Sequence, residues 1–191
     1  MTGQVQFDSH VESLLGAACG LVNALTPGHD GTTPYDAPKG STRARLASQA
    51  LVSQGRQPRV TRAQGDQLAE WATEVRRVFV AGDAGDVDRA ARLVNDLLDR
   101  TQARPRLDRF DDGWSLHFHG PDTTLVVGWA AGIASALALV VGSAWAGRLG
   151  VCDADPCDRV FVDETKNGTR RFCSTRCQSR VKAAAHRARR V

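Results

Sequence analysis

Four cysteines in two close pairs constrain the C-terminal part of this chain more than any other feature of its sequence. Cys152 and Cys157 are separated by four residues, Cys173 and Cys177 by three, and fifteen residues lie between the two pairs. Close pairs let two tight turns bring four thiols to one point, which is what a tetrahedral metal ion requires. The spacing therefore predicts that these four cysteines share one metal ion.

Zinc is the expected metal, because thiolates are good zinc ligands and four of them complete its tetrahedron. No coordination position is then left for a catalytic water, so we expect a structural zinc. The N-terminus lacks a basic segment followed by an apolar run, so we expect no secretory signal and a reducing cytoplasm. A pair of disulfides and an iron–sulfur cluster are the alternatives.

The residues around the two pairs predict a small finger. Residues 160–162 and 169–172 are expected to form a hairpin around Asn167-Gly168, which favours a tight turn with positive φ. The spacing of the second pair places both thiols on one face of the first turn of a helix, with Ser174 as its cap. The order of turn, hairpin and helix is typical of a treble-clef-like zinc finger.

Positive charge is concentrated in the same region. Residues 165–191 hold nine Lys or Arg and no Asp or Glu, whereas the rest of the chain holds 16 basic and 21 acidic residues. A basic surface on an acidic body predicts a polyanionic partner. The candidate nucleic-acid-binding residues are the cations around and after the second cysteine pair: Arg170, Arg171, Arg176, Arg180, Lys182, Arg187, Arg189 and Arg190.

The helix that follows the finger is expected to divide into two faces. Cys177, Val181, Ala184 and Ala188 share one stripe, which should face the hairpin and the metal. The remaining arc is cationic and suits phosphate contact and groove entry, so duplex DNA is the expected partner. A solvated helix without a partner is the alternative.

Residues 1–147 predict a mainly helical domain, and residues 148–191 the zinc finger, which together make an α+β chain. Helices are expected over 7–25, from Ser41 to about residue 51, after the Thr61–Gln64 capping box, and after Asp83 or Asp86. Val87, Ala91, Val94 and Leu98 form the predicted apolar stripe of the fourth helix.

Three further segments interrupt these helices. Residues 26–42 are rich in Gly, Pro and Thr and predict a long loop. Residues 104–120 alternate around Asp111-Asp112-Gly113 and predict a hairpin. Residues 123–147 carry no charge and are long enough to cross a membrane, but their many small residues favour a buried core helix, so no membrane association is expected.

The C-terminal pattern resembles a known zinc finger. The four cysteines, Phe161, Asp163, Asn167, the Arg170-Arg171 pair, Arg180 and Lys182 resemble the CGNR zinc finger. Where that name has Cys-Gly-Asn-Arg, this sequence has Cys177-Gln178-Ser179-Arg180, which keeps the ligand and the arginine.

The resemblance extends loosely to the N-terminal part. The CGNR finger is the C-terminal module of bacterial proteins described as stress-induced transcription regulators, whose N-terminal part is called the ABATE domain. LVNALTPGHDG from Leu21 and LVNDLL from Leu93 resemble segments of that domain. The resemblance implies zinc binding, DNA binding and regulation of transcription.

The sequence thus predicts a cytoplasmic, nucleoid-associated DNA-binding regulator whose N-terminal domain senses a ligand or dimerises. A small-molecule effector and a homodimer are left open. The alternatives are an RNA-binding or ribosome-associated finger, and a zinc-thiolate redox switch or protein-interaction module. No phosphate loop, Ser-His-Asp set or HExxH motif is present, so we expect no enzyme activity.

Two other sites have structural interpretations. His117 and His119 lie on one side of a predicted strand, but no third metal ligand accompanies them, so a half-exposed strand face is favoured over a metal pair. Cys19 lies on the apolar stripe of the first helix and is expected to be a core residue rather than a redox group.

Overall fold

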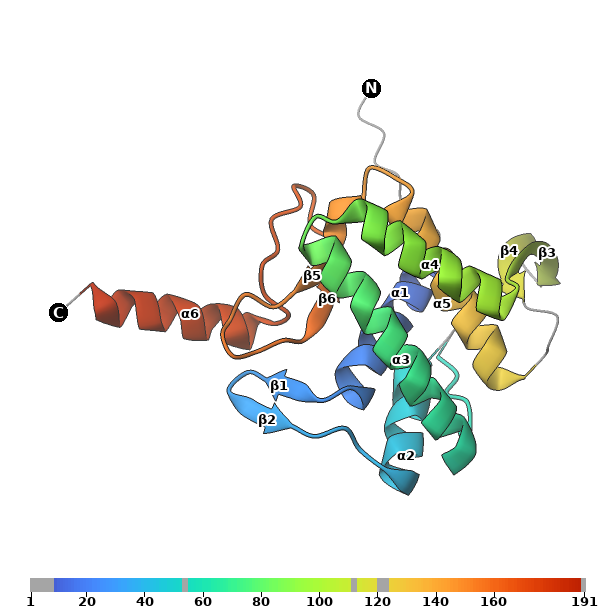
Figure 1. The fold of residues 1–191 in the computed structure, drawn as a ribbon, viewed down its shortest axis with the longest axis horizontal. Coiled ribbons are helices and arrows are strands. Elements are labelled where there is room, and N and C mark those ends of the chain that lie inside the picture. The colour runs from blue at the N-terminus through green and yellow to red at the C-terminus, as the bar shows by residue number, and fades with distance from the viewer. Residues whose placement is uncertain (1–8, 53–54, 111–112, 120–123, 190–191) are drawn as a thin grey trace.

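The computed structural model describes residues 9–52, 55–110, 113–119 and 124–189, and within them the chain forms six α-helices and three two-stranded antiparallel sheets. Five helices gather into one body, and the sixth projects from it (Figure 1). The predicted mainly helical α+β class is confirmed.

The third helix of the body contacts each of the other four, and the first helix contacts three of them. α1 (Ser9–Leu25) contacts α2 (Gly40–Ala50), α3 (Arg62–Asp83) and α5 (Leu125–Val141), while α4 (Val87–Thr101) packs on α3 and α5. The apolar faces of these five helices form one continuous buried cluster. Burial of this apolar surface is the main source of the body's stability.

Side-chain caps start two of these helices as predicted. The Thr61 hydroxyl accepts a hydrogen bond from the Gln64 N–H at 3.3 Å, and Gln64 accepts one from the Thr61 N–H at 2.9 Å. Asp86 caps α4 by accepting from the Arg89 N–H at 3.0 Å. The helix predicted from Ser41 to about residue 51 is present as α2, but Ser41 is not its cap, because α2 begins at Gly40 and its N-cap, Lys39, has no side-chain cap bond.

The prediction of which residues of α4 face the core is wrong by about one position. Among its four residues only Val94 is fully buried, and Val87 is 42% exposed. The buried residues of α4 are Ala90, Leu93, Val94, Leu97 and Thr101. Two leucines bury more apolar surface than Val87 and Ala91 would, so the helix is rotated to bury Leu93 and Leu97.

The long uncharged segment forms a core helix. Its helical part is α5, which has 17 residues and is capped by Thr124, whose hydroxyl accepts from the Val127 N–H. Most of its side chains are buried against α1 and α4, which confirms the expectation of a buried helix. None of the helices among the described residues combines the length and the apolar character needed to cross a bilayer.

The predicted hairpin near residues 104–120 is confirmed. β3 (Arg104–Phe110) pairs antiparallel with β4 (Gly113–His119), with Leu107 opposite Leu116. The proposed turn residues Asp111 and Asp112 lie outside the described residues. Leu107, Trp114 and Leu116 are 64%, 66% and 42% exposed, so this hairpin presents apolar side chains to solvent.

The segment predicted as a long loop contains a second hairpin. β1 (Gly28–Asp30) pairs with β2 (Thr33–Tyr35) across a turn at Gly31, which has a φ of +67°. The Tyr35 hydroxyl donates to the Ala24 carbonyl at 2.7 Å and holds the hairpin against the end of α1. The Asp30-Gly31 dipeptide is the local signal for this turn, and the many surrounding Gly, Pro and Thr residues masked it.

The ribbon of the C-terminal part also differs from the prediction. β6 (Val160–Val162) pairs with β5 (Leu149–Val151), which follows the short 3-10 helix η1 (Ala146–Arg148), and residues 169–172 form no strand. The cysteine turn therefore lies between the two strands rather than before them. The turn prediction holds in part, since Gly168 has a φ of +64°.

The β5–β6 ribbon belongs to the same core as the helices. Leu149, Val160 and Val162 are buried in the main apolar cluster. A Cβ atom on Gly82 of α3 would lie 2.9 Å from the Leu149 Cβ, so the glycine lets the ribbon approach the helix closely. The division of the chain at residue 148 stays a prediction, but the ribbon and the helices share one core.

This shared core predicts that truncating a ribbon residue destabilises the helical body. Leu149→Ala should lower the free energy of unfolding by about 2–4 kcal/mol, because Leu149 is 1% exposed. Urea denaturation followed by far-UV circular dichroism measures this change. Leu139→Ala on α5 is the matched control, since Leu139 is 43% exposed and should cost less than about 1 kcal/mol. Equal effects of the two variants would contradict the shared core.

Candidate metal centre

Four thiols meet at one point beside the β5–β6 ribbon. The Sγ atoms of Cys152, Cys157, Cys173 and Cys177 all lie within 4.8 Å of one another. The Cys157–Cys173 and Cys173–Cys177 separations are both 3.8 Å. A tetrahedron with metal–sulfur bonds of about 2.3 Å has edges of about 3.8 Å, so the cluster has the size of a tetrathiolate metal site. These are the four residues predicted from the sequence.

The sulfur atoms are not bonded to each other. All five cysteines are free thiols, and the 3.8 Å separations are far longer than a disulfide bond of about 2.05 Å. In this structure the cysteines therefore form a ligand set rather than two disulfides.

A tight turn between the two strands positions the first cysteine pair. The Cys152 N–H donates to the Arg159 carbonyl at 3.0 Å, and the Cys157 N–H donates to the Ala154 carbonyl at 2.7 Å. Ala154 is fully buried, which leaves no space for a larger side chain inside the turn. The ribbon thus ends in a closed knuckle that carries two thiols.

A helix start positions the second pair. α6 (Thr175–Ala188) begins after Ser174, whose hydroxyl accepts a hydrogen bond from the Cys177 N–H at 3.3 Å. This confirms Ser174 as the predicted cap. The Cys173 N–H donates to the Cys152 Sγ at 3.4 Å, so the backbone of one pair supports the sulfur of the other. An N–H donor of this kind favours the thiolate, which is the form that binds metal.

Three of the four thiols are buried, and Cys173 is half-buried. Burial raises the pKa of the Cys152 and Cys173 thiols above their usual range. Burial also acts on Cys177, but hydrogen bonds from Ser174 and from the other thiols outweigh it and lower the pKa of that thiol. A metal cation supplies the positive charge that stabilises several thiolates at one buried point.

Comparison with known proteins agrees with this geometry. Residues 148–190 match the family model of the CGNR zinc finger. This C-terminal segment is thus similar to the CGNR zinc finger. The match spans the β5–β6 ribbon, all four thiols and α6. Among curated proteins none matches the chain.

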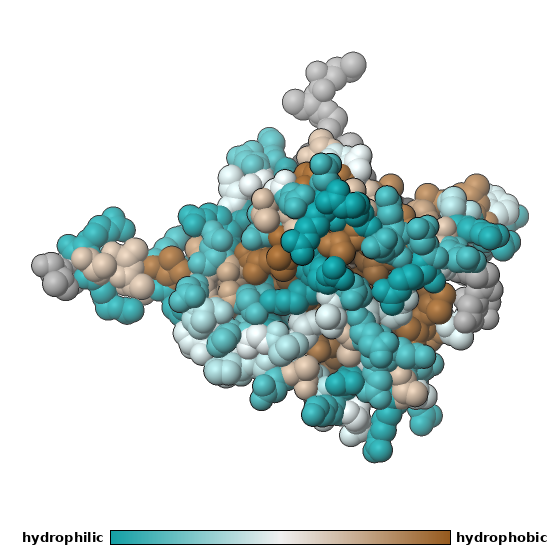
Figure 2. Space-filling view, viewed as in Figure 1, coloured by the Kyte–Doolittle hydropathy of each residue, from teal (hydrophilic) through white to brown (hydrophobic). Residues whose placement is uncertain are grey.

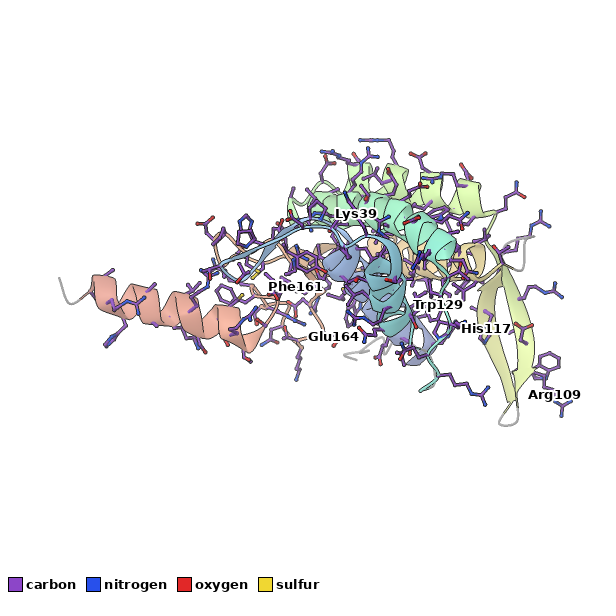
Figure 3. All side chains as sticks on the ribbon, turned by 90° about the horizontal axis from the view of Figure 1, so that it is seen from below. Lys39, Arg109, His117, Trp129, Phe161 and Glu164 are labelled. Carbon is purple, nitrogen blue, oxygen red and sulfur yellow. The ribbon has the colours of Figure 1, made fainter. Side chains whose placement is uncertain are left out.

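Arg170 of the CGNR finger is directed inward. Its guanidinium donates to the carbonyls of Val162, Phe172 and Cys173 at 3.2, 3.0 and 2.7 Å. The guanidinium carbon of Arg170 also lies 4.8 Å from the centre of the Phe161 ring. Figure 3 shows Phe161 between α6 and the helical body. Arg170, which the sequence predicts as a nucleic-acid-binding residue, thus joins the ribbon to the second cysteine pair.

Asp163 supports the same loop. Its carboxylate accepts from the Arg170 and Thr165 N–H groups, both at 2.8 Å, and from the Thr165 hydroxyl. Burial opposes the charge on Asp163, but these hydrogen bonds and the nearby Arg148 outweigh it and lower the pKa of the carboxyl group. Asp163 is therefore an ionised side chain that holds the loop leading to Arg170.

Arg180, the arginine of the CGNR name, binds the cysteine knuckle. Its two terminal nitrogens donate to the carbonyls of Ala154 and Asp155 at 2.6 and 2.5 Å. These carbonyls lie inside the turn between Cys152 and Cys157. Arg180 thus fastens α6 to the turn that carries the first cysteine pair, and its charge is committed to that turn.

Arg171 and Arg176 form exposed ion pairs. Arg171 pairs with Asp153 at 2.6 Å, and Arg176 pairs with Asp30 of the β1–β2 hairpin. The two arginine side chains are 71% and 67% exposed. Exposed pairs of this kind contribute only about 0–1 kcal/mol, so either arginine is available to a phosphate at little cost.

The distal half of α6 is fully exposed. Every described residue from Lys182 to Arg189 is exposed, and the helix extends clear of the body (Figure 1). In Figure 2, hydrophilic side chains lie on either side of a more apolar band along this helix. Among the described residues, Lys182, Arg187 and Arg189 have no acidic partner, and the Arg189 Nε donates to the Ala185 carbonyl of its own helix. Arg190 lies outside the described residues.

The predicted inward stripe of α6 is correct only in its first turns. Cys177 is buried, and Val181 packs beside the thiol cluster. Ala184 and Ala188 are exposed, because the ribbon and knuckle are short and end before the helix does. The prediction that they face the hairpin and the metal is therefore wrong.

A charged junction that the sequence did not reveal joins the finger to the body. The Asp158 carboxylate accepts from Arg76 of α3 at 2.7 Å, from Arg159 at 3.2 Å and from the His29 N–H at 2.9 Å. Burial opposes the charge of Asp158, but the His29 hydrogen bond and the two arginines lower the pKa of its carboxyl group. A Cβ atom on Gly28 would lie 2.1 Å from Asp158, so only glycine fits there.

Asn23 makes a second link between the two parts. Its side-chain amide accepts from the Val160 N–H at 2.8 Å and donates to the Val160 carbonyl at 2.9 Å, as a neighbouring strand would. Asn23 is the asparagine of the LVN segment that begins at Leu21. The segment therefore binds the edge of the finger ribbon, a role that its sequence alone did not indicate.

The remaining candidate sites lie apart from the thiol cluster. Burial raises the pKa of Cys19 to about 12, so its thiol stays protonated at neutral pH, which supports its interpretation as a core residue. The His117 ring lies 4.4 Å from that of His10 beside a cavity of about 310 Å³, which Trp129 also lines. Figure 3 shows His117 and Trp129 at the end of the body away from α6. The side chain of His119 lies outside the described part of the structure.

Arg180 and Arg176 lie on one flank of α6, but we expect only the loss of Arg180 to weaken metal binding. Arg180→Ala should weaken metal retention at least tenfold, because it leaves two carbonyls of the knuckle without donors. Arg176→Ala, the matched control one turn earlier, removes only an exposed ion pair and should leave retention within about twofold. Competition with a chromophoric chelator measures both. Equal retention in the two variants would contradict the structural role of Arg180.

Proposed function

We propose that this chain binds zinc through Cys152, Cys157, Cys173 and Cys177 and binds duplex DNA through α6, as a regulator of transcription. The observation that carries the proposal is the exposed half of α6, which displays Lys182, Arg187 and Arg189 without acidic partners among the described residues. A rigid metal centre at the base of α6 would hold this helix in a fixed position.

Zinc is the metal that fits this donor set best. Four thiolates at tetrahedral spacing suit zinc, which has no redox chemistry and is almost always tetrahedral in structural sites. The four ligands leave no position for a water or substrate, so we expect the metal to hold the fold and not to catalyse a reaction. The match to a zinc-finger family supports the same metal.

Duplex DNA is the partner that the charge distribution favours. A straight exposed helix fits the major groove, and cations on it neutralise phosphates on either side. Single-stranded RNA is bound mainly by aromatic stacking, and no aromatic residue of the Phe, Tyr or Trp type lies within α6. The helical body would then sense a small molecule or dimerise, for which the cavity beside Trp129 and the exposed apolar face of β3–β4 are the available surfaces.

The zinc site predicts a metal content of one ion per chain. Cys177→Ser should abolish bound zinc and lower the melting temperature of the whole chain, because the ribbon that holds the site is part of the main core. Elemental analysis and thermal denaturation measure the two effects. Cys19→Ser is the matched control and should keep one zinc, since Cys19 lies outside the cluster. Iron in place of zinc, or no metal, would reject the assignment.

The exposed cations predict salt-sensitive DNA binding. Replacing Lys182, Arg187 and Arg189 by alanine should abolish most duplex binding and reduce the slope of log affinity against log salt by about 0.9 for each phosphate that is no longer neutralised. Fluorescence anisotropy over a salt series measures the slope, with structured RNA as a competitor. Replacing the exposed Arg45, Arg89 and Arg92 of the helical body by alanine removes the same charge and should change little. An equal decrease in both triple variants, or preferential RNA binding, would reject the proposal.

A further inference from the structure

The first turn of α6 borders a polar groove on the outer side of the finger. The groove has a volume of about 440 Å³, and its walls include Thr169, Arg171, Thr175 and Gln178. Arg171 is the exposed arginine whose pair with Asp153 is weak. The groove therefore combines hydroxyl groups, one amide and one available cation at the point where α6 leaves the finger.

The same side of α6 continues from this groove to the exposed half of the helix. At 100° per residue, Thr175, Gln178, Lys182 and Arg189 fall within one narrow strip, and all four are exposed. Arg176 and Arg180 lie on the other flank, where they bind Asp30 and the cysteine knuckle. The strip is thus a continuous face of α6 that the rest of the fold leaves exposed, while Arg187 lies on the other flank beyond Arg180.

Gln178 is the residue of this strip that carries a primary amide, an uncharged group that can both donate and accept hydrogen bonds. Its side chain makes no hydrogen bond to any other described residue, whereas its N–H donates to the Ser174 carbonyl within the helix. A primary amide carries an acceptor and two donors and matches the N6 and N7 edge of adenine in the major groove. The residue occupies the position of the glycine in the CGNR name, so the side chain adds a functional group at this point.

The surroundings of Gln178 suit base contact rather than phosphate contact. It lies in the first turn of α6, and recognition helices contact base edges through their N-terminal residues. Lys182 lies one turn further along the same strip, and Arg171 lines the same groove as Gln178, so both α6 and the preceding loop bring a cation to the surroundings of the amide. Cations placed in this way bind the phosphates and leave the central amide facing the bases.

We propose that Gln178 is a specificity-determining residue that reads an adenine in the major groove while Arg171 and Lys182 hold the flanking phosphates. This inference rests on the proposed binding of duplex DNA by α6. It assigns sequence preference to Gln178 and positioning to the cations, and it gives Arg180, the arginine of the family name, no base contact.

Selection from a random duplex pool tests the assignment with the full zinc-loaded chain. The wild-type chain should select adenine at one position, and Gln178→Ala should lose that preference and bind the selected duplex about 5- to 150-fold more weakly. The salt dependence should not change, because no phosphate contact is removed. Ser179→Ala is the matched control, since Ser179 is exposed, lies 100° around the helix from Gln178 and does not line the groove, and should keep the preference.

A modified base isolates the contact itself. Replacing the selected adenine by 7-deazaadenine removes the N7 acceptor and should weaken wild-type binding, but it should not weaken Gln178→Ala further. Zinc content and melting temperature should be the same for all variants. If Gln178→Ala keeps the wild-type preference, or if the wild-type chain binds duplex DNA with no preference, the role of Gln178 is wrong and DNA binding stands. If the wild-type chain binds no duplex, the proposed function itself fails.

Discussion

The convergence of four thiols is the constraint on which the C-terminal part of this protein depends. It joins the knuckle between β5 and β6 to the first turn of α6, two segments separated by β6 and a loop without regular structure. A structural zinc at such a site contributes about 10–16 kcal/mol in small fingers, which is comparable to the total stability of a typical domain. Because the ribbon also lies in the main core, we expect metal binding at the four thiols to be coupled to folding of the helical body.

The arginines of the finger divide into two groups with different physical roles. Arg170 and Arg180 direct their planar donor groups at backbone carbonyls of the ribbon and the cysteine turns, so they serve as connectors inside the finger. Lys182, Arg187 and Arg189 project from the exposed half of α6, which extends away from the body. A count of positive charges therefore overstates the charge available to a partner, and the direction of each side chain decides which charges remain.

The parts of the fold that depend on local sequence could be predicted. The capping box at Thr61, the caps at Asp86 and Ser174, the β3–β4 hairpin and each of the two cysteine pairs follow from residues a few positions apart. The β1–β2 hairpin and the pairing of β6 with β5 could not be predicted in the same way. Short strands have weak individual signals, and their pairing is decided by the surface on which they pack.

The sequence by itself determined the metal ligands, the mainly helical class and the concentration of positive charge at one end, because spacing, periodicity and composition are properties of the chain alone. Only the tertiary structure decided which charges are free, that Asn23 and Asp158 bind the finger to the body, and that the ribbon joins the helical core. These contacts join residues up to 137 positions apart. Their energies depend on three-dimensional proximity and burial, which no local pattern of residues encodes.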